Sequence, residues 1–261
     1  MNAETPVPIK KGVGYWNADG SFNRLSTGVD RLGCGWYYNW TPRPDSNGDG
    51  IQAEFIPMVW NGRDVTEKKL DRLRADGHHT LLTFNEPDAR EQANMTVEEA
   101  LTLWPQLMRT GLQLGSPAPA SFHHGWLERF MKEAASRSYR VDFICSHWYG
   151  DITARDAVDQ LQNFLEGQWK NHHRPIWLTE FSGSTGSWLE IIQPPMTREK
   201  NAAFIKKALP MLDSLPYVER YAWFELKWEE TPWENVALVN PQTGNLTAAG
   251  RAYRAAGHSA K

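Results

Sequence analysis

The sequence is poor in cysteine and contains no long hydrophobic run. Only two of its 261 residues are cysteine. Cys34 and Cys145 both lie inside apolar, strand-like runs, so a disulfide framework is excluded and two buried free thiols are expected. No apolar run approaches the about 20 residues needed to cross a membrane. The opening residues, MNAETPVPIKKG, contain no hydrophobic stretch of the kind that a signal peptide needs.

An excess of charge of one sign is also lacking. The formal net charge is −3 and the pI is near 6.3, and no stripe of lysine and arginine suggests a nucleic-acid partner. A chain of 261 residues is long enough for one large hydrophobic core. No internal repeat, low-complexity tract or linker divides it. We therefore expect a single domain over residues 1–261, a monomer, with neither a nucleic-acid nor a membrane partner.

Aromatic residues, by contrast, are abundant. The sequence has thirteen tryptophans and eight tyrosines, and many of them lie at the ends of apolar runs. Tryptophan has a large apolar face and a polar N–H, so it suits either a core or a ligand-binding surface. For a single tryptophan the core is the ordinary interpretation. The clustering at the ends of the runs favours a ligand-binding surface for several of them.

Short apolar runs alternate with helical patterns along the whole chain. These runs are continuous rather than alternating with polar residues, which is typical of a parallel sheet buried on both faces. Eight such strands with intervening helices predict a (β/α)₈ barrel of the TIM type, in the α/β class. An open, doubly wound sheet is the alternative, but no glycine-rich phosphate-binding fingerprint follows any strand. The eight runs cover residues 12–15, 34–38, 54–60, 80–84, 111–115, 142–149, 176–181 and 220–226.

Capping signals mark the start of two of the expected helices. Asp64 and Glu67 form a cap-like pair before a helix that ends at Gly77, and Thr96 and Glu99 stand in the register of a capping box. The other expected helices are apolar stripes at helical spacing. They cover residues 22–32, 126–134, 158–165, 204–209 and 247–256.

Three of the predicted strands end in a glutamate. Glu86 ends the fourth strand, Glu180 the seventh and Glu225 the eighth. In a barrel, the carboxyl ends of the strands meet at one mouth, so Glu86 and Glu180 can face each other across it. Two carboxylates that flank a bond are what glycoside hydrolysis requires. The alternative for each glutamate is an ion pair with lysine or arginine, and for Glu225 that is as good an interpretation as binding a sugar hydroxyl.

The residues beside Glu86 support this interpretation. Asn85 is polar where packing alone would favour an apolar residue, and its amide can bind a sugar hydroxyl. Pro87 fixes its own φ and stops the strand, so the carboxylate is presented at a rigid turn.

Five motifs in order resemble glycoside hydrolase family 128, a family of retaining clan A barrels. The motifs are WYYNW (36–40), FIPMVW (55–60), LLTFNEPD (81–88), SHWYG (146–150) and WLTEFS (177–182). The family contains endo-β-1,3-glucanases and related proteins of β-1,3-glucan recognition. The resemblance implies that Glu86 is the acid/base and Glu180 the nucleophile, and that no cofactor is needed.

Aromatic and polar residues at the predicted mouth are candidates for binding the sugar. Aromatic rings can pack against the C–H faces of sugars, and we expect at least three of these rings to line the cleft. His147 could also steady Glu180 on the next strand, or simply be a satisfied core histidine. Phe181, Trp188 and Trp228 are weaker candidates over the same mouth. The expected sugar-binding residues are Asn39, Trp40, Trp60, Asn85, His147, Trp148, Tyr149 and Trp223.

Two patterns suggest a metal, but neither is complete. Three pairs of adjacent histidines occur, at 78–79, 123–124 and 172–173. Neighbouring residues on a strand point to opposite faces, so such pairs rarely chelate together, although the pair at 123–124 could touch sugar. Residues 45–56 begin like a calcium-binding loop, but the twelfth position is Ile56 rather than the glutamate that such a loop needs. We expect no metal.

The sequence thus predicts a retaining endo-β-1,3-glucanase whose partner is a β-1,3-glucan polysaccharide or oligosaccharide. Two alternatives stay open: a hydrolase of a β-1,4-linked glycan, and a non-catalytic glucan-binding barrel. The intact pair Glu86 and Glu180 argues against the second. Localisation is not fixed by these residues, and a secreted or periplasmic location is the expectation.

Overall fold

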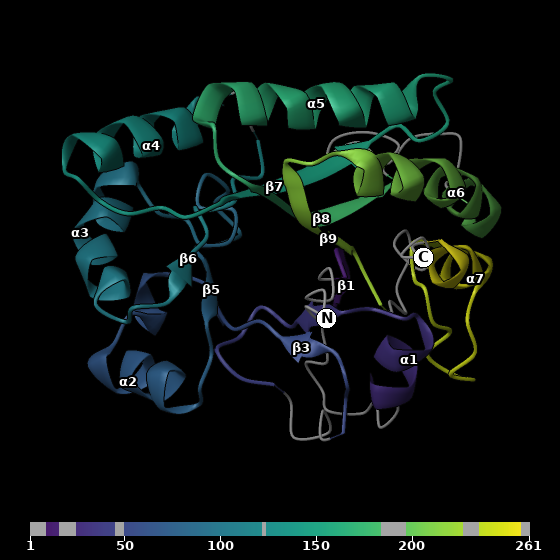
Figure 1. Ribbon diagram of the computed structural model, residues 1–261, viewed down its shortest axis with the longest axis horizontal. Helices are drawn as coiled ribbons and strands as arrows, with labels where there is room; N and C mark the ends of the chain where they lie inside the picture. Colours follow the sequence, from purple (N-terminus) through teal and green to yellow (C-terminus); the bar gives the residue numbers. More distant parts are fainter. Residues whose placement is uncertain are drawn as a thin grey trace, which may run out of the picture.

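The computed structural model describes residues 9–15, 25–44, 50–121, 124–183, 197–226 and 235–256. Its strands lie at the centre and its helices around them (Figure 1). All strand pairs in the two sheets are parallel. The strands are β1 (Lys11–Gly14), β2 (Trp36–Tyr38), β3 (Glu54–Phe55), β4 (Met58–Val59), β5 (Thr80–Thr83), β6 (Gln113–Leu114), β7 (Ile144–Gly150), β8 (Ile176–Gly183) and β9 (Val218–Trp223).

The strands run in barrel order. One sheet has the order β3-β2-β1-β9-β8-β7 and the other the order β4-β5-β6. At one junction β3 and β4 are consecutive pieces of one strand position, separated only by Ile56 and Pro57. At the other, Gly115 and Phe143 form a parallel bridge, and Asp142 N donates to Leu114 O at 2.8 Å. The eight predicted strand positions are therefore all present, and the α/β fold with the arrangement of a (β/α)₈ barrel is confirmed.

The helices follow the predicted pattern, with one different cap. They are α1 (Leu25–Arg31), α2 (Glu67–Ala75), α3 (Val97–Met108), α4 (Trp126–Ser136), α5 (Ala157–His172), α6 (Arg198–Ser214) and α7 (Ala248–Ala255), with a 3-10 turn, η2, at Gly62–Asp64. The capping box of Thr96 and Glu99 is confirmed at the start of α3. The helix predicted before Gly77 is confirmed as α2, but its predicted cap was wrong, because Thr66 rather than Asp64 caps it. Asp64 belongs to η2 and pairs with Lys69 Nζ at 2.6 Å.

A cluster of buried aromatic side chains connects the strands to the mouth of the barrel. Trp36 and Trp177 have ring centroids 5.4 Å apart, and Phe143 stacks on Trp177 at 4.3 Å. Above them Tyr38 contacts Trp40 at 4.7 Å. Offset and tilted rings at these distances stabilise each other beyond their burial. This cluster holds Tyr38 and Trp40 in fixed positions below the site.

Both thiols are free and buried, as predicted. Burial raises the pKa of Cys34 to about 12 and also raises the pKa of Cys145. A thiol with a raised pKa is a poor nucleophile, so the cysteines belong to the packing. Among the described helices, none combines the length and apolarity that crossing a membrane would take.

Candidate active site

Glu86 is held at a sharp bend just beyond β5. The buried strand brings the chain to the mouth, where Asn85 N donates to Trp60 O at 2.9 Å and Glu86 N donates to Ala118 O at 2.8 Å. Glu86 is 3% exposed, and its φ of 43° lies in the left-handed region. That conformation is costly for a residue with a Cβ and persists only where the surrounding structure holds it, as happens at many functional sites. The backbone therefore fixes where this carboxylate points.

Glu180 lies in β8 and is surrounded by hydrogen-bond donors. Its Oε1 accepts from Trp40 Nε1 at 2.8 Å and from Tyr38 OH at 3.4 Å, and its Oε2 accepts from Tyr149 OH at 2.5 Å. Burial raises the pKa of both tyrosines well above 10.0, so their hydroxyls remain protonated. Gly14 on β1 leaves room for the indole of Trp40, because a Cβ there would come within 2.8 Å of the ring. Glu180 is thus a buried carboxylate, and the ionised form that burial disfavours accepts hydrogen bonds from three side chains.

His147 bridges the two glutamates. Its Nδ1 lies 3.0 Å from Glu86 Oε1, and its Nε2 lies 3.5 Å from Glu180 Oε1. The register of β7 and β8 pairs His147 directly with Glu180. One carboxylate oxygen of Glu86, one of Glu180 and one ring nitrogen all lie within 4.8 Å of one another. Among the described residues, the two glutamates therefore face each other and the imidazole, rather than lysine or arginine.

The charges of this cluster depend on one another. Burial alone would lower the pKa of His147, but the carboxylates of Glu180 and Glu86 outweigh it and raise that pKa above 6.5. For Glu180, burial raises the pKa above 4.5. His147 opposes this increase, Glu86 adds to it, and the hydrogen bonds from Tyr149 and Trp40 reduce it. The protonation of Glu180 and that of His147 therefore depend on each other.

The two predicted asparagines have different surroundings. Asn85 is 3% exposed, and its Nδ2 donates to Gln92 Oε1 at 3.2 Å. Its Oδ1 has no hydrogen-bond partner among the described residues, so an acceptor stands ready beside Glu86. Asn39, which is also buried, donates to Arg43 O at 2.9 Å and accepts from the Thr41 hydroxyl at 2.8 Å. These bonds stabilise the turn that carries Trp40, and binding of sugar by Asn39 stays a prediction.

Three of the predicted aromatic residues lie at the site or next to it. Trp40 and Tyr149 both contact Glu180 directly. Trp60 is half-buried and lines a neighbouring groove. Binding of sugar by these three rings stays a prediction.

Two aromatic predictions were wrong. Trp223, predicted at the rim, is fully buried, and its Nε1 donates to Val236 O at 2.8 Å. Phe181 is also fully buried, with its ring 5.1 Å from that of Trp223. Trp148 is half-buried and stacks on Phe204 of α6 at 5.7 Å, and its binding of sugar stays a prediction. Side chains alternate between the two faces of a strand. His147 and Tyr149 point to the mouth, so Trp148, which lies between them, points outward to the helices.

Other residues of the predicted site can be placed in part. Glu225 is buried, and it lies near enough to Tyr38 to raise the pKa of that hydroxyl. Trp188, Trp228, His123 and the first residues of the calcium-like loop, 45–49, lie outside the described residues. Two residues with a part in the site were missed: Tyr38 and Gln92. The motif around Tyr38 could have indicated it, whereas nothing in the sequence marks Gln92.

Within the described part of the chain, the group whose geometry could hold a cation is Glu86, His147 and Glu180. Their atoms already bind one another and the donors Trp40 and Tyr149. Two carboxylates with the imidazole of His147 between them suit acid–base and nucleophilic chemistry.

A pair of opposed carboxylates at the mouth of a parallel-stranded α/β fold is the arrangement of a glycoside hydrolase. Comparison with known proteins agrees: the family model for the glycosyl hydrolase catalytic core matches residues 15–253. Among solved structures, a subgroup I endo-β-1,3-glucanase of glycoside hydrolase family 128 (GH128) from Amycolatopsis mediterranei, in complex with laminarihexaose, is 42% identical. The match covers 95% of this chain and 100% of that one, with a TM-score of 0.84. The chain belongs to the glycosyl hydrolase catalytic core family, and within it to GH128.

Two further relatives differ in kind. A subgroup III curdlan-specific exo-β-1,3-glucanase of GH128 from Blastomyces gilchristii is 31% identical, with 96% of this chain and 99% of that chain covered and a TM-score of 0.74. Alkali-sensitive linkage protein 1 of Schizosaccharomyces pombe is 32% identical over 230 residues, which is 85% of this chain. The chain spans only 40% of the length of that protein.

Proposed function

We propose that this protein is an endo-acting glycoside hydrolase that cleaves β-1,3-glucan with retention of configuration. The observation that carries the proposal is the opposition of Glu86 and Glu180, with carboxylate oxygens within 4.8 Å of each other. Retaining enzymes hold their two carboxyl groups about 5–5.5 Å apart, whereas inverting enzymes need at least about 6.5 Å to admit a water molecule. The likeness to the A. mediterranei endo-β-1,3-glucanase supports the choice of substrate.

In the first step Glu180 is the nucleophile. A carboxylate oxygen of Glu180 forms a bond to the anomeric carbon as the bond to the glycosidic oxygen breaks. Glu86 gives its proton to that oxygen, which leaves as the hydroxyl of the departing glucan. In the second step Glu86 takes a proton from water, the water oxygen bonds to the anomeric carbon, and Glu180 leaves as a carboxylate.

The position of His147 accounts for the proton on Glu86. Two arrangements hold the same number of protons: a protonated imidazole between two carboxylates, and a neutral imidazole beside a protonated Glu86. They differ only in the place of one proton along the 3.0 Å contact between Nδ1 and Glu86 Oε1. His147 therefore stores the proton that Glu86 delivers, while Trp40 and Tyr149 donate hydrogen bonds to the ionised form of Glu180.

Azide rescue of two alanine variants tests the roles. In Glu86→Ala the nucleophile remains, so an aryl β-glucoside with a good leaving group should still form the covalent intermediate. Azide should then capture that intermediate and give the β-configured glycosyl azide. In Glu180→Ala azide should enter the vacated place of the nucleophile and give the α-configured product. The opposite configurations would reverse the roles.

The substrate is tested separately with the unaltered protein. Reducing-sugar release from laminarin, with xylan, mannan and cellulose as comparisons, decides between β-1,3 and β-1,4 linkages. Release from laminarin alone is expected. No release from any of the four, with binding to laminarin retained, would favour the non-catalytic glucan-binding barrel.

A further inference from the structure

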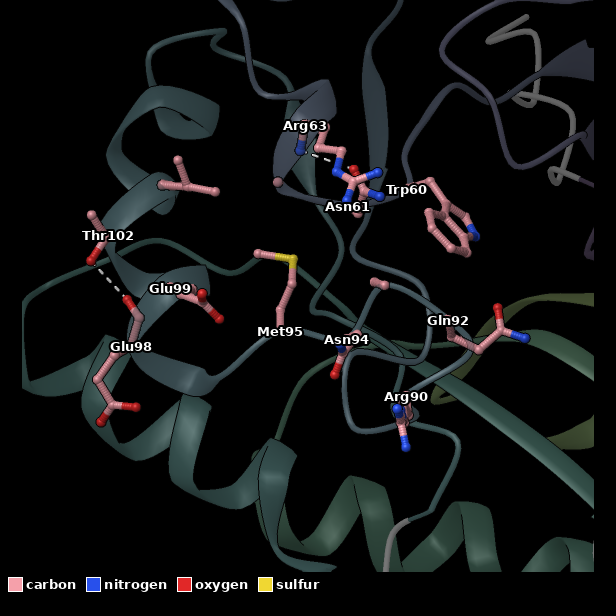
Figure 2. A pocket seen from close by; sticks show the side chains of 13 residues that line it. Trp60, Asn61, Arg63, Arg90, Gln92, Asn94, Met95, Glu98, Glu99 and Thr102 are labelled. Atoms are coloured by element: carbon pink, nitrogen blue, oxygen red, sulfur yellow. Dashed lines mark hydrogen bonds between the residues drawn. The ribbon is translucent and has the colours of Figure 1, made fainter.

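The turn that carries Glu86 is held on one side by the loop that follows it. Ala89 N donates to Glu86 O at 3.0 Å and closes the turn. The loop, seen from Arg90 to Met95 in Figure 2, then doubles back, and Met95 N donates to Pro87 O at 2.8 Å. This side of the turn is thereby tied to the segment that leads into α3.

On its other side the turn is joined to the loop after β6 in both directions. Glu86 N donates to Ala118 O at 2.8 Å. In return, the half-buried carboxylate of Asp88 accepts from Ala120 N at 2.7 Å and from Ser121 N at 3.0 Å. One backbone donor of the turn thus binds the loop, and two backbone donors of the loop bind the turn. Asp88 supplies both acceptors, so its side chain connects the two segments.

The backbone of Glu86 needs such a connection. Its φ of 43° lies in the left-handed region, which is strained for a residue with a Cβ and persists only where neighbouring groups hold it. The hydrogen bond from Glu86 N forms only while Ala118 O stays in place, and Pro117 and Pro119 on either side of that residue have no N–H to fix the loop. Hydrogen bonds to a carboxylate are shorter and stronger than those between neutral groups. The two bonds to Asp88 therefore help to offset the strain at Glu86.

We propose that Asp88 is a positioning residue for the acid/base. It holds the loop after β6 against the turn, and so keeps the carboxyl group of Glu86 aimed at the glycosidic oxygen. The inference rests on the proposed function, because it takes the role of Glu86 from it. Glu180 lies on β8 and accepts its hydrogen bonds from side chains on β2, just after β2 and on β7. Loss of Asp88 should therefore weaken proton transfer and leave the nucleophile in place.

The test compares two substrates that differ only in their leaving group, phenyl β-laminaritrioside and dinitrophenyl β-laminaritrioside. Dinitrophenolate departs without a proton, whereas the phenol needs one from Glu86. The quantity measured is kcat/KM, because it covers the steps up to the covalent intermediate and leaves out the second step, in which Glu86 acts as the base. In Asp88→Ala the ratio of kcat/KM for the phenyl substrate to that for the dinitrophenyl substrate should fall about tenfold to hundredfold, since a displaced acid loses part of its contribution.

Asp142→Ala is the matched control. Asp142 is also a half-buried aspartate that accepts from a backbone N–H of the sixth strand position, Leu114 N at 2.7 Å. It precedes β7, however, and so lies at the opposite end of the barrel from the glutamates. Its loss should leave the ratio unchanged, whatever it costs in stability. If Asp88→Ala does not fold, Asp88→Asn takes its place. It has the same shape and an acceptor for one of the two N–H groups, and the ratio should still fall.

An unchanged ratio in the Asp88 variant would overturn the inference, because a merely structural residue lowers activity on both substrates alike. A fall of the ratio in Asp142→Ala as large as in the Asp88 variant would overturn it too. In both cases cleavage of laminarin by the unaltered protein would leave the proposed function intact. If the unaltered protein cleaves neither laminarin nor either aryl substrate, the proposed function itself fails.

Discussion

Replacing Trp223 by alanine tests whether this residue belongs to the core or to the sugar-binding surface. Its side chain is fully buried, its ring contacts Phe181 at 5.1 Å and Tyr253 at 6.3 Å, and its Nε1 donates to Val236 O at 2.8 Å. Truncating a buried tryptophan leaves a cavity and costs about 3–5 kcal/mol. For a protein of this size that corresponds to a fall in Tm of about 6–20 °C.

The assay is thermal unfolding followed by near-UV circular dichroism, with Trp169→Ala as control. Trp169 is 38% exposed and stacks on Tyr217, so its loss should cost about 1 kcal/mol. Trp223→Phe keeps most of the volume and isolates the hydrogen bond, because Val236 O then loses its donor at a cost of about 1–3 kcal/mol. An unchanged Tm in Trp223→Ala together with lost glucan affinity would refute the reasoning and return this residue to the cleft.

Two further predictions concern catalysis. The pH profile of kcat/KM should be bell-shaped: activity rises as Glu180 ionises, at a pH above 4.5 because its pKa is raised, and is lost as His147 loses its proton, at a pH above 6.5 because that pKa is raised too. Tyr149→Phe removes a hydrogen bond that lowers the pKa of Glu180, so the acid limb should move to higher pH; a shift to lower pH would contradict this assignment. Gln92→Ala should lower kcat about threefold to tenfold on every substrate, because Asn85 Nδ2 loses its hydrogen-bond acceptor. Gln92→Glu keeps an acceptor at that position and should preserve kcat. Equal losses in both variants would show that Gln92 does not act through that hydrogen bond.

The sequence by itself determined the strands and the position of the two carboxylates along the chain. Continuous apolar runs are a local signal of buried parallel strands, and a polar residue that interrupts the end of such a run is conspicuous because burial penalises it. Glu86 and Glu180 could therefore be identified before any contact was known. Successive side chains on a strand point to opposite faces, and applying this rule to the sequence of β7 would have placed Trp148 on the face opposite His147 and Tyr149.

Only the tertiary structure decided what surrounds these carboxylates. Tyr38 and Glu180 are 142 positions apart, and no local pattern shows that their side chains meet. Trp223 ends β9 near the mouth and Trp40 follows the end of β2, but Phe181 and Tyr253 pack against Trp223 and bury it. The bond between Asn85 and Gln92 depends on the path of the loop after β5. Burial and pairing are set by what the rest of the chain brings to a position, which a sequence pattern cannot specify.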